Sequence, residues 1–592
     1  MNILLVYPKM PPSFWSFTYA LRLIGKKAAM PPLGLLTVAG LIPQERHGLR
    51  LIDMNVGELT DADLAWADAV FISAMIVQRD SLRDVARRAK QMGKVTVAGG
   101  PYPTSYVGSD ELRDIDHLVL DEVEETLPGF LKDLEHDTAE PVYRAPLKPS
   151  ITASPLPRYD LINLNDYATM QVQFSRGCPK NCDFCDITKL YGRIPRTKSP
   201  VQILAEFEQL YQLGWGGPLF MVDDNFIGNW REALELLGPV RQWQQEHNYP
   251  FRFHTEASVD LVRHEALMDA MAAAGFDTVF VGLETPNEDA LRTMQKHQNV
   301  KKGDPDYLER SVRTLQGKGF EVTAGFILGV DNDAENPFDP MIEFVQRGGI
   351  PMAMVSPLNV LKGTDLEHRL EREGRLRGNP VGTNFELILN FVPQMDPQVL
   401  LDGYKRVLDT LYDAKLKNYF ERCLTLFEHL DRSRQPKLSS KPSWHSEPGS
   451  VLRRALREIP PAILVSALKF LVRVLLRHPA HFTEALTFVA KGHHFRQMTE
   501  QLLLAEAFEL CVHRELRAIV AELAKRAVLH TREEQEQFRL YLDGRIALIR
   551  KEYAKIHADF KYRTARTVAT FLGTLQDELR RYGAVISLPT AL

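Results

Sequence analysis

The chain has 592 residues, of which 45% are hydrophobic and 25% charged, and its formal net charge is -4. These fractions are typical of globular proteins and do not indicate disorder. A charge so close to neutral gives no general attraction to polynucleotides, so nucleic acid is not an expected partner. Domains usually have roughly 100 to 200 residues, which predicts three or four units in a chain of this length.

Residues 1–135 alternate between short apolar runs and helical patterns. The first run has neither a basic start nor a long apolar core, so we expect a strand there and not a signal peptide. Strands are expected at 3–7, 49–53, 70–73, 95–98 and 117–120, and helices at 34–41 and 81–91. This alternation predicts an α/β domain with a doubly wound, Rossmann-like parallel sheet.

The carboxyl ends of these strands are the expected ligand site, because open parallel sheets bind ligands beyond that edge. Glycines at the edge let a flat ligand approach the backbone closely. Periodicity alone leaves open a nucleotide, a flavin, a corrin or a structural module with no ligand. The residues expected at the edge are Tyr7, Pro8, Ser73, Ala74, Met75, Gly99, Gly100, Pro101 and Tyr102.

A proline-rich stretch separates the first domain from the second. Five prolines between residues 136 and 167 disfavour helix and suit an extended linker. The strand and helix alternation resumes from residue 172 and defines a second domain over 168–390. Within it, Ser199 followed by Pro200 predicts a helix start, with serine as the cap and proline in the first helical position.

Three of the five cysteines lie in one short run: Cys178, Cys182 and Cys185. An iron-sulfur cluster is normally held by four thiolates, so a run of three with no fourth cysteine nearby implies an open iron site. Zinc with a histidine as fourth ligand is the alternative, but the nearest histidines, His136 and His247, are distant in sequence. Disulfides are not expected from an odd cluster in a chain with so few cysteines.

Polar residues follow several apolar runs of the second domain. This pattern predicts a barrel whose chemistry takes place at the carboxyl ends of its strands. The residues in these positions are Asp223, Asp224, Glu256, Gly282 and Glu284. Taken singly, such acids are usually solvated or capping residues. The cations Arg193, Arg196 and Lys198 could neutralise a ligand carboxylate or form salt bridges with the following helix.

Beyond residue 390 the pattern changes to long helices, which predicts a helical C-terminal region over 391–592. Helical patterns cover 400–427 and 501–550, and a polar connector covers 432–449. The isolated Cys423 and Cys511 are expected to be buried small hydrophobes. Residues 462–477 are strongly apolar but contain three cations and are too short to span a bilayer. They are expected to form a buried helix, a helix on a membrane surface or the wall of an apolar groove.

The cysteine spacing, with Phe184 directly before the last cysteine, resembles that of the radical S-adenosylmethionine enzymes. The resemblance implies a [4Fe-4S] cluster on Cys178, Cys182 and Cys185 whose open iron is chelated by S-adenosylmethionine. Reductive cleavage of that molecule would release a 5'-deoxyadenosyl radical, and the electron would come from an external donor such as flavodoxin or ferredoxin.

The order of the polar strand ends resembles the partial (β/α)6 barrel of the same family. The resemblance implies that Asp223 and Asp224 hold the methionyl end of S-adenosylmethionine. It places Glu256 near the ribose, and Gly282 and Glu284 near the adenosyl part.

Two segments of the first domain, Phe14-Trp-Ser-Phe17 through Gly34 and Ala98-Gly-Gly-Pro-Tyr-Pro-Thr-Ser105, resemble cobalamin-binding radical S-adenosylmethionine proteins. They are especially similar to the subgroup that contains hopanoid C-methylases. The Asp-x-His-x-x-Gly motif of other cobalamin proteins is absent, because His117 has Ile115 and Leu120 where the motif needs aspartate and glycine. We therefore expect cobalamin to bind with no protein histidine on cobalt.

The resemblance implies a cytoplasmic, cobalamin-dependent methyltransferase that C-methylates an unactivated carbon of a small molecule or a lipid. A hydrophobic polycyclic or isoprenoid lipid is the expected substrate, with peripheral contact at the inner membrane face. Two alternatives remain: a cobalamin-dependent radical enzyme that cyclises or rearranges its substrate, and a non-catalytic cobalamin-binding sensor. The cysteine run argues against the sensor. Residues 1–177 contain no cysteine, which sets aside the methylthiotransferases.

Overall fold

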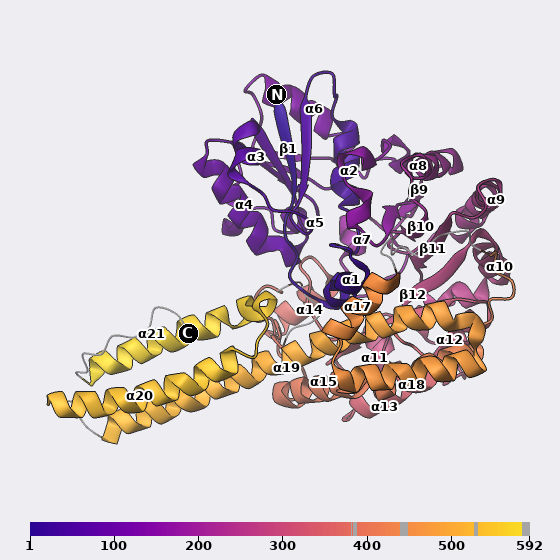
Figure 1. Cartoon of the computed structure of the whole chain (residues 1–592). Helices are drawn as coiled ribbons and strands as arrows, with labels where there is room; N and C mark the ends of the chain where they lie inside the picture. The colour runs from indigo at the N-terminus through magenta and orange to yellow at the C-terminus, as the bar shows by residue number, and fades with distance from the viewer. Residues whose placement is uncertain (381, 383–386, 438–447, 526–530, 583–592) are drawn as a thin grey trace. The chain divides into compact units, whose positions relative to one another are not determined.

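Two six-stranded parallel sheets organise the first of two units into which the chain divides, Met1–His494 (Figure 1). The second unit, Phe495–Leu592, is helical where it is described. The computed structural model describes residues 1–380, 382, 387–437, 448–525 and 531–582.

The first sheet has the strand order β2-β1-β3-β4-β5-β6. All neighbouring strands are parallel, which confirms the doubly wound fold. The strands are β1 (Asn2–Tyr7), β2 (Gly48–Asp53), β3 (Ala69–Ser73), β4 (Val95–Gly99), β5 (His117–Leu120) and β6 (Val142–Arg144). The five predicted strands are therefore present. The sixth, β6, lies inside the predicted linker and pairs with β5.

Helices cover both faces of this sheet. They are α2 (Leu33–Leu41), α3 (Asp61–Trp66), α4 (Arg79–Gln91), α5 (Pro101–Ser105) and α6 (Leu127–Glu135), while the residues of α1 (Thr18–Ile24) lie outside the two apolar cores that flank the sheet. Leu4 and Val6 of β1 pack with α3, α4 and α5 on one face. Ile3 and Leu5 pack with α2 and α6 on the other, so β1 is apolar on both sides.

The second sheet is open and runs in the order β7-β10-β11-β12-β13-β14, all parallel. It is the predicted partial barrel. Its strands are β7 (Met170–Val172), β10 (Gly217–Met221), β11 (Phe251–Glu256), β12 (Phe276–Glu284), β13 (Glu321–Leu328) and β14 (Ala353–Pro357). The helices between them are α8 (Pro200–Gln212), α9 (Trp230–Glu246), α10 (Glu265–Ala274), α11 (Glu288–Thr293), α12 (Tyr307–Gly317) and α13 (Phe338–Gly348).

The start of α8 is as predicted. The Ser199 side chain accepts a hydrogen bond from the Gln202 amide, and Pro200 takes the first helical position. Before this helix, the antiparallel strands β8 (Ser175–Arg176) and β9 (Arg196–Thr197) bracket the cysteine run and the short α7 (Ile187–Leu190).

The C-terminal region is helical, as predicted. The helix α14 (Asp365–Arg372) precedes this region, whose helices are α15 (Pro397–Leu411), α16 (Lys417–His429), α17 (Pro448–Glu458), α18 (Pro461–Arg477), α19 (Phe482–Lys525), α20 (Arg532–Tyr553) and α21 (Lys561–Arg581). The predicted stretch 400–427 forms two helices, and Leu416, with φ of 55°, begins the second. Most of the predicted connector, 438–447, lies outside the described residues.

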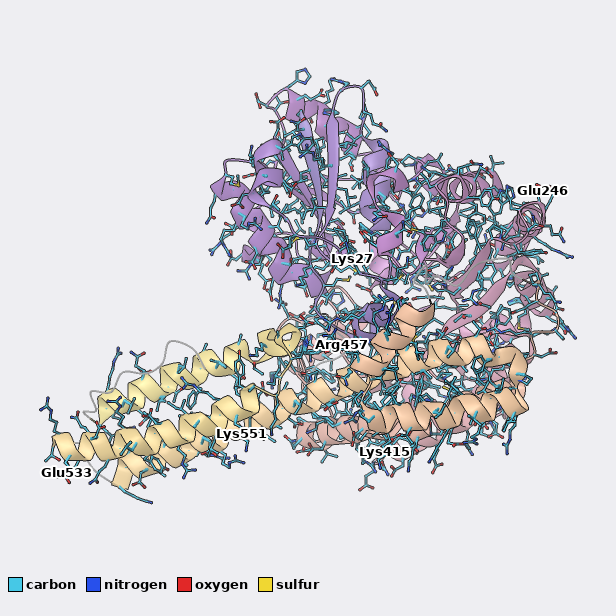
Figure 2. All side chains as sticks on the ribbon, viewed as in Figure 1. Lys27, Glu246, Lys415, Arg457, Glu533 and Lys551 are labelled. Carbon is cyan, nitrogen blue, oxygen red and sulfur yellow. The ribbon has the colours of Figure 1, made fainter. Side chains whose placement is uncertain are left out.

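The second unit pairs α19 with α20 through apolar and ionic contacts. Phe538, Leu542 and Ile546 of α20 are buried, and Arg545 forms an ion pair with Glu515 at 2.9 Å. Charged side chains such as Glu533 and Lys551 point outward from α20 (Figure 2). No helix in the described part of the chain is long and apolar enough to cross a membrane.

Candidate active site

The cysteine run forms a loop between β8 and α7, with Cys178, Cys182 and Cys185 each half-buried. Gly177 adopts φ of 98°, and a Cβ at this position would lie 2.9 Å from the Gly192 carbonyl oxygen. Only glycine therefore lets the loop pass so close to the segment that enters β9.

The Cys178 and Cys182 sulfurs each lie close to an amide donor. Asn225 donates to the Cys178 sulfur at 3.7 Å, and Gln298 donates to the Cys182 sulfur at 3.6 Å. Burial raises the pKa of Cys185, and the charge of Cys182 adds to that effect. Buried thiols of this kind stay neutral unless a cation compensates them, as coordinated iron does. Together with donors that stabilise cluster sulfurs, this environment fits an iron-sulfur cluster.

Three predicted carboxylates come together at the carboxyl ends of β10 and β11. Asp224 accepts a hydrogen bond from the Gly177 amide at 2.8 Å, and Asp223 accepts one from the Ser175 amide. Burial raises the pKa of Asp223 to about 7 and that of Asp224 to about 6. Burial, with repulsion from these two acids, raises the pKa of Glu256 to about 7. One Asp223 oxygen, Oδ2, is buried with no hydrogen-bond partner in the described structure. The group fits a positively charged ligand.

The end of β12 brings Gly282 and Glu284 against the cysteine loop. Glu284 forms a buried ion pair with Lys296 at 2.5 Å, and Lys296 Nζ lies 5.6 Å from the centre of the Phe184 ring. A Cβ on Gly282 would lie 2.8 Å from Lys296 Nζ, so glycine leaves room for this pair. Burial alone would lower the pKa of Lys296, but the charge of Glu284 raises it. Sequence reasoning missed Lys296, which belongs to no motif.

The predicted edge of the first sheet contains the point where the strand order reverses, between β1 and β3. Gly100 adopts φ of 91° there, and a Cβ would lie 2.8 Å from the Ser73 hydroxyl oxygen. Met75 is exposed at this edge. Two predicted residues lie behind it, because Ala74 and Tyr102 belong to the domain core. The Tyr102 hydroxyl donates to Glu111 at 2.5 Å.

Histidine is absent from the segments that follow these strands, 8–13, 54–58, 74–78, 100–105 and 121–125. His117 begins β5, at the opposite end of that strand from the predicted edge, and its Nδ1 lies 2.8 Å from the Glu140 carbonyl oxygen. This placement puts the His117 ring away from the predicted edge.

A buried ion network joins the segment after β5 to the strand before the cysteines. Arg176 contacts Glu122 at 2.9 Å and Glu124 at 2.7 Å. Arg196 reaches Glu122 at 2.7 Å, and the Ser154 hydroxyl donates to Glu124 at 2.6 Å. Both glutamate side chains are only 2% exposed. The network fixes the cysteine loop against the first domain.

The three cations singled out in the sequence all have partners within the protein. Arg196 neutralises a carboxylate, that of Glu122 in the first domain. Lys198 instead forms the salt bridge expected with the following helix, to Glu206 at 2.5 Å. Arg193 donates to Asn181 in the cysteine loop.

An aromatic face lies inside the partial barrel, formed by the half-buried Phe220, His254 and Phe280. The rings of Phe220 and His254 stack with centroids 4.7 Å apart and an interplanar angle of 4°. Trp15, from the first domain, lies with its ring 5.1 Å from that of Phe280. Burial lowers the pKa of His254 to about 4, so its ring is neutral at pH 7. The face carries no formal charge. Its aromatic residues gave no sequence signal beyond ordinary strand patterning.

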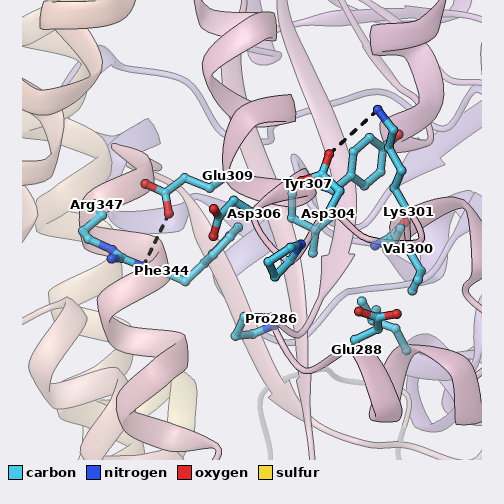
Figure 3. Close-up of a pocket in the computed structure, with 14 residues that line it drawn as sticks. Pro286, Glu288, Val300, Lys301, Asp304, Asp306, Tyr307, Glu309, Phe344 and Arg347 are labelled. Atoms are coloured by element: carbon cyan, nitrogen blue, oxygen red, sulfur yellow. Dashed lines mark ion pairs between the residues drawn. The ribbon is translucent and has the colours of Figure 1, made fainter.

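The pocket in Figure 3 lies elsewhere in the second domain and is lined partly by α12. Two ion pairs join charged residues that line it: Lys301 with Asp304 at 3.8 Å, and Arg347 with Glu309 at 3.4 Å. None of the predicted site residues lines it.

Three family models match the chain. A B12 binding domain matches residues 26–131, and the Radical SAM superfamily matches residues 172–345. A domain of unknown function, DUF4070, matches residues 364–506.

The chain is also similar to curated proteins. It is 45% identical over 414 residues to the uncharacterized methyltransferase sll1242 of Synechocystis sp., covering 70% of this chain and 76% of that protein. It is 37% identical over 380 residues to the hopanoid C-2 methylase of Rhodopseudomonas palustris, covering 63% of this chain and 71% of that protein.

One solved structure shares the fold: the radical S-adenosylmethionine methyltransferase TsrM of Kitasatospora setae with cobalamin and a [4Fe-4S] cluster bound. The TM-score is 0.52 at 14% identity, over 83% of this chain and 99% of that one. At this identity the likeness concerns the fold alone.

Proposed function

The chain belongs to the cobalamin-binding radical S-adenosylmethionine methyltransferases of the group that contains hopanoid C-methylases, and we propose that it C-methylates an unactivated carbon of a hydrophobic polycyclic or isoprenoid lipid. Its cofactors are a [4Fe-4S] cluster, S-adenosylmethionine and cobalamin. When bound, they supply the radical that removes a hydrogen atom from carbon and the methyl group that replaces it.

Cys178, Cys182 and Cys185 would hold the cluster. Their burial and the amide donors on two of the sulfurs support this assignment. An external one-electron donor such as flavodoxin or ferredoxin would deliver the electron. Phe184 and the Glu284–Lys296 pair would keep water from the adenosyl side of the site, since Lys296 lies over the Phe184 ring and the pair is buried.

Asp223, Asp224 and Glu256 would hold the methionyl and ribose parts of S-adenosylmethionine. Their raised pKa values show that burial leaves their negative charge poorly compensated, so an ammonium or sulfonium group would be attracted to them. The hydroxyl groups of a ribose would donate to the same carboxylates.

The edge of the first sheet would hold cobalamin. Ser73, Met75, Gly99 and Gly100 lie at the carboxyl ends of β3 and β4, next to the reversal of strand order, and the glycines admit a flat ring. The segments at this edge contain no histidine, which supports binding with no imidazole on cobalt.

The aromatic face carries the substrate assignment. Phe220, His254, Phe280 and Trp15 offer apolar contact with no formal charge, and Glu256 pairs with Phe280 in the β11–β12 register. Apart from the His254 ring and the Trp15 indole N–H, the residues of this face offer a substrate no polar partner, so a strongly polar substrate would regain little of its lost hydration, whereas an apolar ring system would gain from burial. Because such a lipid resides in a membrane, we propose that the chain works in peripheral contact with one.

The test is anaerobic reconstitution with iron, sulfide and cobalamin, followed by incubation with a lipid extract, reduced flavodoxin as the one-electron donor and S-adenosylmethionine labelled in its methyl group. The expected product is a labelled lipid, heavier by one methylene unit, that is absent with the Cys178→Ala variant. Label only in water-soluble molecules would refute the lipid assignment. An altered lipid without label would point to the cyclising or rearranging alternative, and no S-adenosylmethionine cleavage would point to the sensor.

A further inference from the structure

The helix α18 presents apolar side chains on two opposite faces. Ile463, Ala467, Phe470 and Val474 are buried, and the Phe470 ring stacks on Phe420 of α16 with centroids 4.7 Å apart. The opposite face carries apolar residues that face solvent. These are Val465, Leu468, Val472, Leu475 and Leu476, with exposed fractions of 56%, 64%, 48%, 55% and 78%. Packing against the neighbouring helices therefore buries only some of the apolar residues of α18.

The five exposed residues form one stripe along the helix. They recur at intervals of three and four residues, which places them on a single side of the helix. A continuous apolar stripe in contact with water is costly, and such stripes are typical of surfaces that bind a partner.

All charged residues of α18 are positively charged. Lys469, Arg473 and Arg477 follow one another at four-residue spacing, and α18 contains no acidic residue. Arg473 is paired with Glu421 of α16 at 3.1 Å. Lys469 and Arg477 form no ion pair with any of the described residues. Cations along the edge of an apolar stripe complement the headgroups of an anionic membrane.

We infer that α18 docks flat on an anionic membrane surface, with Leu468, Val472 and Leu475 among the acyl chains and Lys469, at the edge of the stripe, on the headgroup phosphates. This inference rests on the proposed function, because a lipid substrate is the reason for the protein to bind a membrane. It names the surface that would make the contact. A second copy of the chain is a poorer partner, since symmetric pairing of α18 would bring like charges together.

The test is co-sedimentation of the full chain with vesicles of phosphatidylcholine alone or mixed with phosphatidylglycerol. The wild type should pellet with the mixed vesicles, and less so at high salt. A Leu468→Glu, Leu475→Glu variant should bind at least about tenfold more weakly, whereas the matched Leu540→Glu, Leu548→Glu variant on exposed leucines of α20 should bind as the wild type does. A Lys469→Gln variant should lose about fivefold in affinity.

Circular dichroism of each variant checks that the helices are intact. Absence of vesicle binding by the wild type, or equal loss in the α18 and α20 variants, would overturn the inference. So would a dimer in light scattering that dissociates in the α18 variant. The proposed function is judged separately with detergent-dispersed lipid, which the reconstituted α18 variant should methylate as the wild type does. Vesicle binding without methylation of any lipid would refute the function and leave the docking surface intact.

Discussion

Replacing Arg176 with methionine should loosen the cysteine loop from the first domain. The change keeps an apolar stem but removes the contacts of 2.9 Å to Glu122 and 2.7 Å to Glu124. Glu122 would retain Arg196, while Glu124 would retain only the Ser154 hydroxyl. Because the glutamates are 2% exposed, we expect a cost of about 3–5 kcal/mol, the usual cost of removing one partner of a buried pair.

The free-energy cost of Arg176→Met should depend on pH, and the pKa of Glu124 determines in which direction. Burial alone would raise the pKa of Glu124, but Arg176 and Ser154 hold it below 4.5. In the wild type, the stabilisation is present above the unfolded pKa and is lost as pH falls through the lowered folded value. Without Arg176, burial should raise this pKa above 4.5, so the folded variant is penalised at neutral pH and recovers as Glu124 takes up a proton. The difference between the two proteins should therefore shrink as pH falls from neutral toward the raised pKa of Glu124 in the variant.

Hydrogen exchange of residues 117–126 and 173–198 measures this local opening. A cost of about 3–5 kcal/mol corresponds to exchange faster by roughly two to four orders of magnitude. The matched control is Arg144→Met, since Arg144 is 45% exposed and pairs with Asp121 at 2.8 Å. That surface pair should be worth less than about 1 kcal/mol. If Arg176→Met accelerated hydrogen exchange no more than the control does, or by a factor that did not depend on pH, the idea that the network holds the loop would be refuted.

Three further outcomes are expected. Alanine at Cys178, Cys182 or Cys185 should abolish the brown cluster absorption and 5'-deoxyadenosine formation, and cleavage of S-adenosylmethionine by the triple variant would contradict the cluster assignment. Electron paramagnetic resonance of the cob(II)alamin form should show no nitrogen coupling from the protein and the same spectrum after His117→Ala, whereas a histidine triplet would disprove the assignment. Burial raises the folded pKa of Glu256 from 4.5 to about 7, so the free energy of unfolding should fall as pH rises through that window. Glu256→Gln should therefore be about 2–3 kcal/mol more stable than the cofactor-free wild type at pH 8 and equally stable at pH 4. Equal gains of Glu256→Gln in urea unfolding at both pH values would contradict that pKa.

The elements that the sequence predicted well are those with a local signal. Short apolar runs identified five of the six strands of the first sheet, and Ser199 with Pro200 marked the start of α8. The strand β6 was missed because it has only three half-exposed or exposed residues in a proline-rich segment. No local pattern could reveal the Glu122–Arg176 pair, whose members are 54 positions apart. The apolar run of α18 could not show from periodicity which of its two faces is covered.

The position of Trp15 bears on how enzymes of this kind can be recombined. Trp15 contributes to the inner face of the barrel, and the Met30 sulfur accepts a hydrogen bond from Gln171 on β7 at 3.1 Å. A chimera joined at the proline-rich linker would thus exchange Trp15, and with it part of the proposed substrate face, along with the first domain. The first two domains therefore cannot be exchanged independently. A graft that takes residues 10–31 from the same protein as the barrel would preserve selectivity better than one cut at the apparent domain boundary.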